Sequence, residues 1–167
     1  MNPIEALAAD LGRALQLAGA HVTTAESCTG GGIAEAITRI AGSSAWFEVG
    51  FVTYSNEQKT RQLGVPAQLF GQVGAVSREV VEAMARGAQR GSGGARFAVA
   101  VSGVAGPAGG SPDKPVGTVW LAWAASDQVF ARRFQFAGDR QAVREQSVEA
   151  ALVGLISLVN GENPVQG

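Results

Sequence analysis

One short stretch of this chain constrains its fold more than any other. Three β-branched residues (22–24) run into a turn of hydroxyl, thiol and glycine residues (24–32), and an apolar-periodic run (33–41) follows. This order is typical of a strand that ends in a tight turn and continues as a helix. Unpaired amides at the start of such a helix favour negative charge above the end of the strand. A nucleophile and its oxyanion hole could share this position, although the hydroxyls could equally be ordinary helix caps.

Ser27 and Cys28 are the candidate nucleophiles of this turn. A thiolate at the start of a helix is activated, which keeps Cys28 open as an alternative. A catalytic cysteine commonly works with a histidine, however, and no histidine lies within local reach of the turn. We therefore favour Ser27 as the nucleophile.

The composition excludes several classes of protein. The 167 residues are 46% hydrophobic and 16% charged, with a formal net charge of −1, which is typical of one globular domain. We place that domain at 1–160 and a flexible tail at 161–167. The chain has no basic stripe for nucleic acid, no apolar run of bilayer length and no signal-peptide pattern. Its single cysteine suits a reducing compartment, so we expect a cytoplasmic protein.

The pattern of the remaining chain predicts an α/β fold. Helices are predicted over 3–18 and 33–41, from a Ser55 cap to near Gly64, from a Ser77 cap to the break at 91–94, and from an Asp139 cap to 159. Strands are predicted over 22–24, 46–54, 97–101, 117–125 and 128–136, the last two as an antiparallel hairpin. This order indicates a three-layer α/β/α sandwich on a mixed, mostly parallel sheet of about five strands. The long glycine- and proline-rich loop at 102–116 is of a length that is often functional.

Reactive side chains are scarce, which limits the chemistry. The one histidine, His21, starts the strand that Ser27 ends, so the two lie about 20 Å apart at about 3.3 Å per residue, and we expect no Ser-His-Asp triad. One histidine and one cysteine make no zinc cluster. A carboxylate-only metal site stays open, but no close set of acids stands out, and we expect no cofactor.

The two lysines are the candidate bases for a serine–lysine pair. Lys114 completes a Ser-x-x-Lys pattern, but it lies in a proline-rich loop and not at a helix start. Lys59 is expected just after the second strand, which Tyr54 ends, at the sheet edge that Ser27 occupies if the two strands are parallel. Both Lys59 and Tyr54 could instead be ordinary structural residues. Glu26 either orients Lys59 or is a surface acid.

Six segments of the sequence resemble the CinA C-terminal domain family. They are TAESCTGG (24–31), AGSSAWF (41–47), GFVTYSN (50–56), GAVS (74–77), SGVAGP (102–107) and KPVGTV (114–119). The resemblance covers essentially the whole chain and is to the stand-alone form, without the N-terminal domain of longer members. It implies hydrolysis of nicotinamide mononucleotide to nicotinate mononucleotide and ammonia in bacterial pyridine-nucleotide salvage, without a metal.

The resemblance also implies roles for individual residues. The catalytic serine, tyrosine and lysine of the family correspond to Ser27, Tyr54 and Lys59. Neutral Lys59 would take the Ser27 proton, with Tyr54 holding or relaying it. Backbone amides at Cys28, Thr29 and Gly30 would hold the oxyanion.

Substrate contacts are expected along the same edge of the sheet. The residues expected to make them are Gly31, Ser102, Gly103, Gly106 and Arg140. We expect Arg140 to bind the phosphate, although it could be a plain first-turn residue, and the loop 103–110 to close over the ligand. The expected partner is a small nucleotide, with no nucleic acid or membrane, in a homo-oligomer for which a dimer is favoured. A nucleotide sensor without turnover and an amidase for another small carboxamide stay open.

Overall fold

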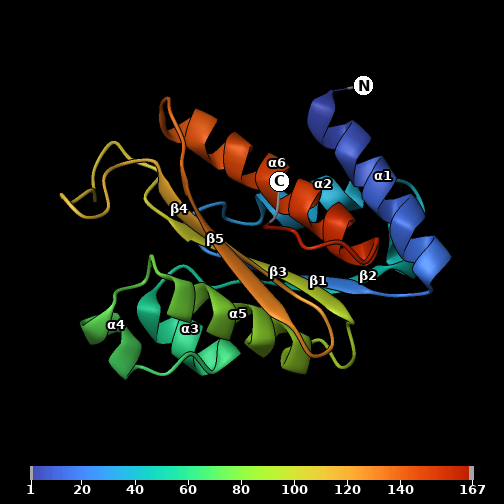
Figure 1. The fold of residues 1–167 in the computed structure, drawn as a ribbon, viewed down its shortest axis with the longest axis horizontal. Coiled ribbons are helices and arrows are strands. Elements are labelled where there is room, and N and C mark those ends of the chain that lie inside the picture. Colours follow the sequence, from blue (N-terminus) through green and yellow to red (C-terminus); the bar gives the residue numbers. More distant parts are fainter. Residues whose placement is uncertain (1, 166–167) are drawn as a thin grey trace.

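The computed structural model describes residues 2–165 and shows a five-stranded sheet between two layers of helices (Figure 1). The strands are β1 (Val22–Glu26), β2 (Phe47–Val52), β3 (Phe97–Gly103), β4 (Thr118–Ala124) and β5 (Val129–Gln135). The helices are α1 (Pro3–Ala18), α2 (Gly32–Thr38), α3 (Asn56–Leu63), α4 (Gln68–Gln72), α5 (Arg78–Gly91) and α6 (Arg140–Val159). Helices α1, α2 and α6 cover one face of the sheet, and α3, α4 and α5 lie on the other.

The sheet has the order β2-β1-β3-β4-β5. Strand β1 pairs in parallel with both β2 and β3, whereas β4 is antiparallel to both β3 and β5. Four strands therefore run one way and β4 runs the other. This arrangement confirms the predicted mixed, mostly parallel sheet and its late hairpin. It also brings the carboxyl ends of β1, β2 and β3 to one edge.

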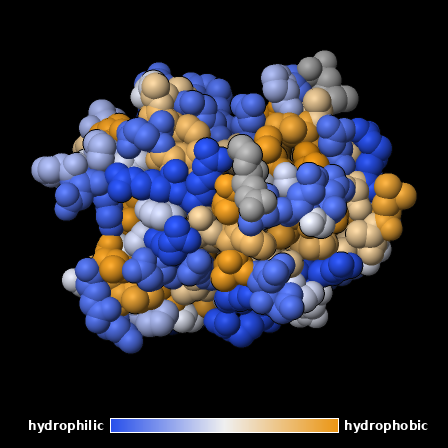
Figure 2. Space-filling view, in the orientation of Figure 1, coloured by the Kyte–Doolittle hydropathy of each residue, from blue (hydrophilic) through white to orange (hydrophobic). Residues whose placement is uncertain are grey.

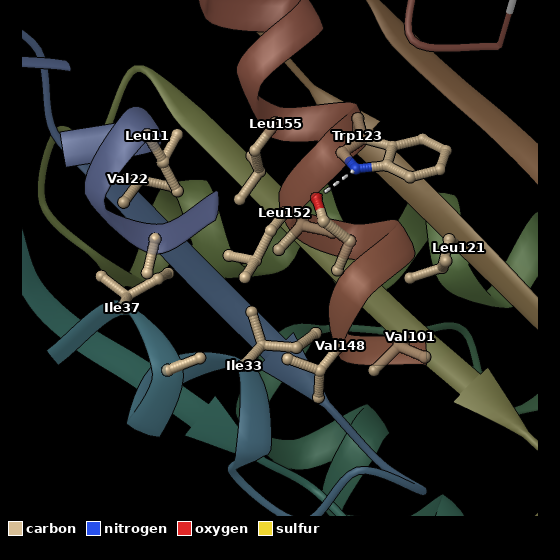
Figure 3. Packing of buried hydrophobic residues seen from close by; sticks show 14 of the residues in the cluster. Leu11, Val22, Ile33, Ile37, Val101, Leu121, Trp123, Val148, Leu152 and Leu155 are labelled. Atoms are coloured by element: carbon tan, nitrogen blue, oxygen red, sulfur yellow. Dashed lines mark hydrogen bonds between the residues drawn. The ribbon is translucent and has the colours of Figure 1, made fainter. Parts of the chain in front are cut away.

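The two faces of the sheet carry side chains of different size. Toward α6 the central strands present large residues such as Val101, Leu121 and Trp123 (Figure 3). Toward α5 the same strands present alanines: Ala98, Ala100, Ala122 and Ala124. The buried run at 97–101 thus alternates large and small residues, so that each face fits a different helix layer. On the large side, the Trp123 indole donates to the Ala151 carbonyl at 3.0 Å.

Predicted helix starts are confirmed by their caps. Side chains of Asn2, Ser55, Ser77 and Asp139 each accept a hydrogen bond from the backbone amide three residues on. The short helix α4 was not predicted, because it has no side-chain cap and only five residues. Helix α2 is shorter than predicted: the chain turns through Gly42 (φ 88°) and a 3₁₀ turn at Ser43–Ala45 before β2. Of the predicted tail, 166–167 lie outside the described residues.

The face of the molecule drawn in Figure 2 shows hydrophilic residues interspersed with apolar areas. Within residues 2–165, four large hydrophobic residues are exposed: Leu17, Val52, Tyr54 and Val153. No helix within residues 2–165 combines the length and apolarity needed to cross a membrane.

Candidate active site

The expected catalytic residues meet at the carboxyl edge of β1, β2 and β3. There a cavity of about 310 Å³, the active-site pocket, is lined by side chains and backbone that include Ser27, Cys28, Tyr54, Lys59, Ser102, Gly103, Gly106 and Arg140. Parallel strands place their carboxyl ends together, which is why segments far apart in sequence converge here. Thr29, Gly30 and Gly31 do not line the pocket. Asn56, Ala75 and Val76 also line the pocket and were not predicted to, because they carry no reactive group that would single them out in the sequence.

Ser27 lies in a tight turn between β1 and α2. Its amide donates to the Val101 carbonyl of β3 at 3.1 Å, and its carbonyl accepts from the Gly30 amide at 3.0 Å. Gly30 and Gly31 both adopt positive φ (59° and 104°), which lets the chain reverse before the helix. The hydroxyl of Ser27 has no hydrogen-bond partner among the described residues. The turn therefore holds the Ser27 backbone and leaves its side chain at the pocket.

The three amides expected to hold an oxyanion differ in availability. The Gly30 amide is occupied, because it closes the turn onto Ser27. The amides of Cys28 and Thr29 donate to no other residue within the described chain, although the Cys28 amide lies close enough to its own thiol to oppose the rise in that thiol's pKa. Two unpaired donors thus remain beside Ser27, not the three that were expected. Gly31 is the N-cap of α2 and lies against Val52, outside the pocket.

Lys59 is a buried amine in the first turn of α3, which starts at the Ser55 cap. Only 1% of the residue is exposed, and burial lowers the pKa of the Lys59 ammonium below its ordinary value. Its Nζ donates to the main-chain carbonyl of Tyr54 at 3.0 Å, and it forms no ion pair with any described carboxylate. Such surroundings favour the neutral amine, which is the form that can act as a base.

Cys28 is a buried thiol, and its surroundings oppose ionisation. Burial raises the pKa of Cys28 to about 11, and the nearby Glu26 carboxylate adds to the rise. A reactive cysteine needs the opposite shift, since the thiolate is the nucleophile. The environment thus favours Ser27 over Cys28.

Tyr54 and Arg140 meet at the mouth of the pocket. Tyr54 is 61% exposed, and its hydroxyl accepts a hydrogen bond from Arg140 Nη2 at 2.9 Å. Arg140 Nη1 donates to the Gly106 carbonyl at 2.9 Å. Helix α6 is thereby joined to the glycine-rich loop and to the end of β2. The expected contact of the Tyr54 hydroxyl with Lys59 or Ser27 is not made among the described residues, because only the Tyr54 backbone reaches Lys59.

Both expectations for Glu26 were wrong. It is fully buried, so it is not a surface acid, and no hydrogen bond or ion pair joins it to Lys59. Its carboxylate accepts hydrogen bonds from the Thr29 hydroxyl (2.5 Å), the Ile33 amide (2.8 Å) and the Ala34 amide (3.0 Å). Side chains alternate along a strand, so Glu26 points to the α2 side when Ser27 points to the pocket.

The remaining candidates lie away from the pocket. His21, at the other end of β1, lies 3.5 Å from Glu48. Lys114 donates to the Val73 carbonyl and holds two loops together. No group of three His, Cys, Asp or Glu side chains in the described part of the chain could hold a metal. A second cavity of about 890 Å³ shares Ala105 and Arg140 with the active-site pocket.

Comparison with known proteins fixes the family. The profile of the CinA C-terminal domain matches residues 4–159. Nicotinamide-nucleotide amidohydrolase PncC of Pseudomonas putida is 73% identical over 95% of this chain and 98% of its own, and that of Escherichia coli K12 is 56% identical over 87% and 88%. The crystal structure of the competence/damage inducible protein CihA from Agrobacterium tumefaciens is 45% identical, with a TM-score of 0.91 over 96% of this chain and 97% of that one. The resemblance read from the sequence is thus confirmed, and the chain belongs to the CinA C-terminal domain family.

Proposed function

We propose that this chain hydrolyses the carboxamide of nicotinamide mononucleotide to nicotinate mononucleotide and ammonia, with Ser27 as nucleophile and Lys59 as base. The names of the two amidohydrolase relatives, matched over nearly their whole length, support the reaction. The observation that carries the mechanism is Lys59. A buried amine with a lowered pKa and no carboxylate partner lines the same pocket as an unpaired serine hydroxyl.

Acylation follows from these two side chains. Neutral Lys59 takes the proton of the Ser27 hydroxyl as Oγ attacks the carboxamide carbon. The amide of Cys28, a residue that lines the pocket, holds the negative charge on the former carbonyl oxygen together with the amide of Thr29, which follows it in the turn behind the lining. The tetrahedral intermediate then collapses: the carbon–nitrogen bond breaks, and the leaving nitrogen takes the proton from Lys59 and departs as ammonia.

Deacylation uses the same base. Neutral Lys59 takes a proton from water, whose oxygen attacks the ester carbonyl. The bond to Ser27 Oγ breaks, and Oγ recovers its proton from Lys59. The products are the nicotinate mononucleotide and the free enzyme, so that no metal or cofactor is needed.

Tyr54 and Arg140 have supporting roles in this proposal. The Tyr54 carbonyl accepts a hydrogen bond from one N–H of Lys59, and this bond orients the lone pair of the neutral amine. Arg140 binds the phosphate with the N–H groups that its bonds to Gly106 and Tyr54 leave free, since a guanidinium has five. Ser102 and the backbone of Gly103 and Gly106 complete the substrate contacts, whereas Gly31 lies outside the pocket and makes none.

We also propose that the protein works in the cytoplasm on a small-molecule substrate. The single cysteine suits a reducing compartment such as the cytoplasm. A net charge of −1 gives no field that would gather nucleic acid, so the partner is a small nucleotide. We also propose a homodimer, which sedimentation equilibrium measures directly.

Ammonia release tests the reaction. Purified protein is mixed with nicotinamide mononucleotide, its dephosphorylated riboside, free nicotinamide and other small carboxamides, and ammonia is followed in a coupled assay. We expect the mononucleotide to have the highest kcat/KM and Ser27→Ala to release no ammonia above background. Binding of the mononucleotide without ammonia would indicate a sensor, and a higher kcat/KM for another carboxamide would indicate a different amidase.

A further inference from the structure

Glu26 is a buried carboxylate for which the proposed reaction has no use. It is 0% exposed, it precedes Ser27 directly, and it faces away from the active-site pocket. No lysine or arginine among the described residues forms an ion pair with it. Burying a carboxylate without a cation is unfavourable unless hydrogen bonds replace its water. The three hydrogen bonds that the Glu26 carboxylate accepts therefore indicate its role.

Two of those bonds cap helix α2. The N-cap of α2 is Gly31, which has no side chain to offer its amides. The Glu26 side chain, at the end of β1, caps the helix instead. Its Oε1 accepts from the Ile33 amide and its Oε2 from the Ala34 amide. The start of a helix also favours a negative charge. The carboxylate thus fixes the start of α2 to the end of β1.

The third bond holds the turn that carries Ser27. Thr29 Oγ1 donates to Glu26 Oε1 at 2.5 Å, and from the other side Arg144 Nη2 donates to the Thr29 carbonyl at 3.2 Å. Thr29 is therefore held by both its side chain and its backbone. The peptide plane before Thr29 carries the unpaired Thr29 amide, and the Cys28 amide lies one residue further back in the same turn.

We propose that Glu26 is a positioning residue, which acts through the Thr29 hydroxyl to fix the amides that serve Ser27. The inference rests on the proposed function, because it assumes that Ser27 attacks and that those amides hold the oxyanion. Donors aligned in advance stabilise the transition state more than the bound substrate. Loosening the turn should therefore lower kcat and leave KM nearly unchanged.

Two variants of Thr29 separate positioning from packing. Thr29→Val keeps the branched shape but removes the bond to Glu26, which still caps α2. Thr29→Ser keeps the hydroxyl. We expect kcat with nicotinamide mononucleotide to fall about 10- to 100-fold in Thr29→Val, as misplaced catalytic groups do. KM should stay within about twofold, and Thr29→Ser should recover most of the loss.

Glu26→Gln tests the carboxylate itself. A glutamine amide has one acceptor oxygen, and its NH₂ group would face a backbone or hydroxyl donor. We expect a kcat at least as low as that of Thr29→Val. Asn2→Ala is the matched control, since it removes a helix cap from α1, far from the pocket. It should lower the melting temperature and leave kcat unchanged.

The outcomes distinguish this inference from the proposed function. A kcat for Thr29→Val within twofold of the wild type, or a Thr29→Ser variant as slow as Thr29→Val, would overturn the positioning role. If Glu26→Gln does not fold, the comparison of Thr29→Val with Thr29→Ser still tests the positioning role. Full activity in Ser27→Ala would instead overturn the proposed nucleophile, whatever the Thr29 variants do.

Discussion

Replacing Lys59 by methionine should lower kcat by about 100-fold or more and stabilise the protein at neutral pH. A lysine at its ordinary pKa of 10.5 is neutral in only about 0.1% of molecules at pH 7.5, and each unit by which burial lowers the pKa raises that fraction about tenfold. The same unit corresponds to about 1.4 kcal/mol of unfavourable burial of the ammonium. The burial that suits Lys59 to the proposed role of base therefore also destabilises the fold.

The direction of the pH dependence follows from the lowered pKa. Below the folded-state pKa, Lys59 is protonated in both states and the folded state bears the full cost of the buried charge. Between that pKa and 10.5 the folded protein has released the proton and the unfolded chain still holds it, so the free energy of unfolding rises with pH. Above pH 10.5 Lys59 is neutral in both states, so folding no longer has to bury a charge there. The advantage of Lys59→Met should thus be largest at neutral pH and shrink as the pH approaches 10.5.

The magnitude is measurable. Loss of the Lys59–Tyr54 hydrogen bond costs about 1 kcal/mol at every pH, so the part that varies with pH isolates the charge. A difference of 1 kcal/mol shifts the melting temperature by about 2–4 °C in a chain of this size. Loss of the general base should lower kcat about 10²- to 10⁴-fold. Melting curves from pH 6 to 10 and ammonia release measure both effects.

Matched variants complete the test. Lys114→Met removes the other lysine, which also donates to a main-chain carbonyl but outside the pocket, and should keep activity within a few-fold. Tyr54→Phe keeps the carbonyl that holds Lys59 and should be impaired less than any Lys59 variant. Lys59→Arg keeps the charge but cannot deprotonate, so it should be as inactive as Lys59→Met. Substantial activity in Lys59→Arg would refute the reasoning, as would a stability difference that does not change with pH.

Three further expectations follow from the site. Cys28→Ala should keep kcat within a few-fold, because a thiol with a pKa of about 11 is protonated at working pH, and a loss as large as that of Ser27→Ala would give Cys28 the nucleophilic role. Arg140→Ala should raise KM for nicotinamide mononucleotide at least tenfold and barely change turnover of the riboside, with exposed Arg13→Ala as control; equal losses on both substrates would show that Arg140 does not bind the phosphate. Dialysis against EDTA should leave kcat unchanged, and activity that is lost and then restored by zinc, manganese or magnesium would contradict a metal-free mechanism.

Local sequence signals predicted the frame of the site well. The Ser55 cap set the start of α3 and so the place of Lys59, and the β-branched run before Ser27 set the strand that carries it. These signals depend on neighbours within a few residues, which a single sequence displays. Successive side chains of a strand point to opposite faces of the sheet, so the sequence also implies that Glu26 faces away from Ser27. Its burial, which was not predicted, agrees with this alternation.

Contacts between distant segments were not predictable in the same way. Arg140 meets Tyr54 across 86 positions, and Arg144 meets Thr29 across 115, so both depend on how α6 packs over the finished sheet. The Gly30 amide is unavailable to an oxyanion because it donates to the Ser27 carbonyl within the turn. This bond accompanies a positive φ at Gly30, a conformation that glycine permits but does not require. Such details decide which donors and cations reach a substrate.

The central claim is that Ser27 carries the acyl group. Mixing the enzyme with excess nicotinamide mononucleotide, quenching in acid at a series of times and mapping peptides by mass spectrometry measures this directly. The account predicts that the peptide containing Ser27 gains the mass of the mononucleotide less ammonia, with fragment ions that place the addition on Ser27 and not on the adjacent Cys28. Addition at Cys28 or Lys59, or no addition at any quench time while ammonia is released, would contradict it.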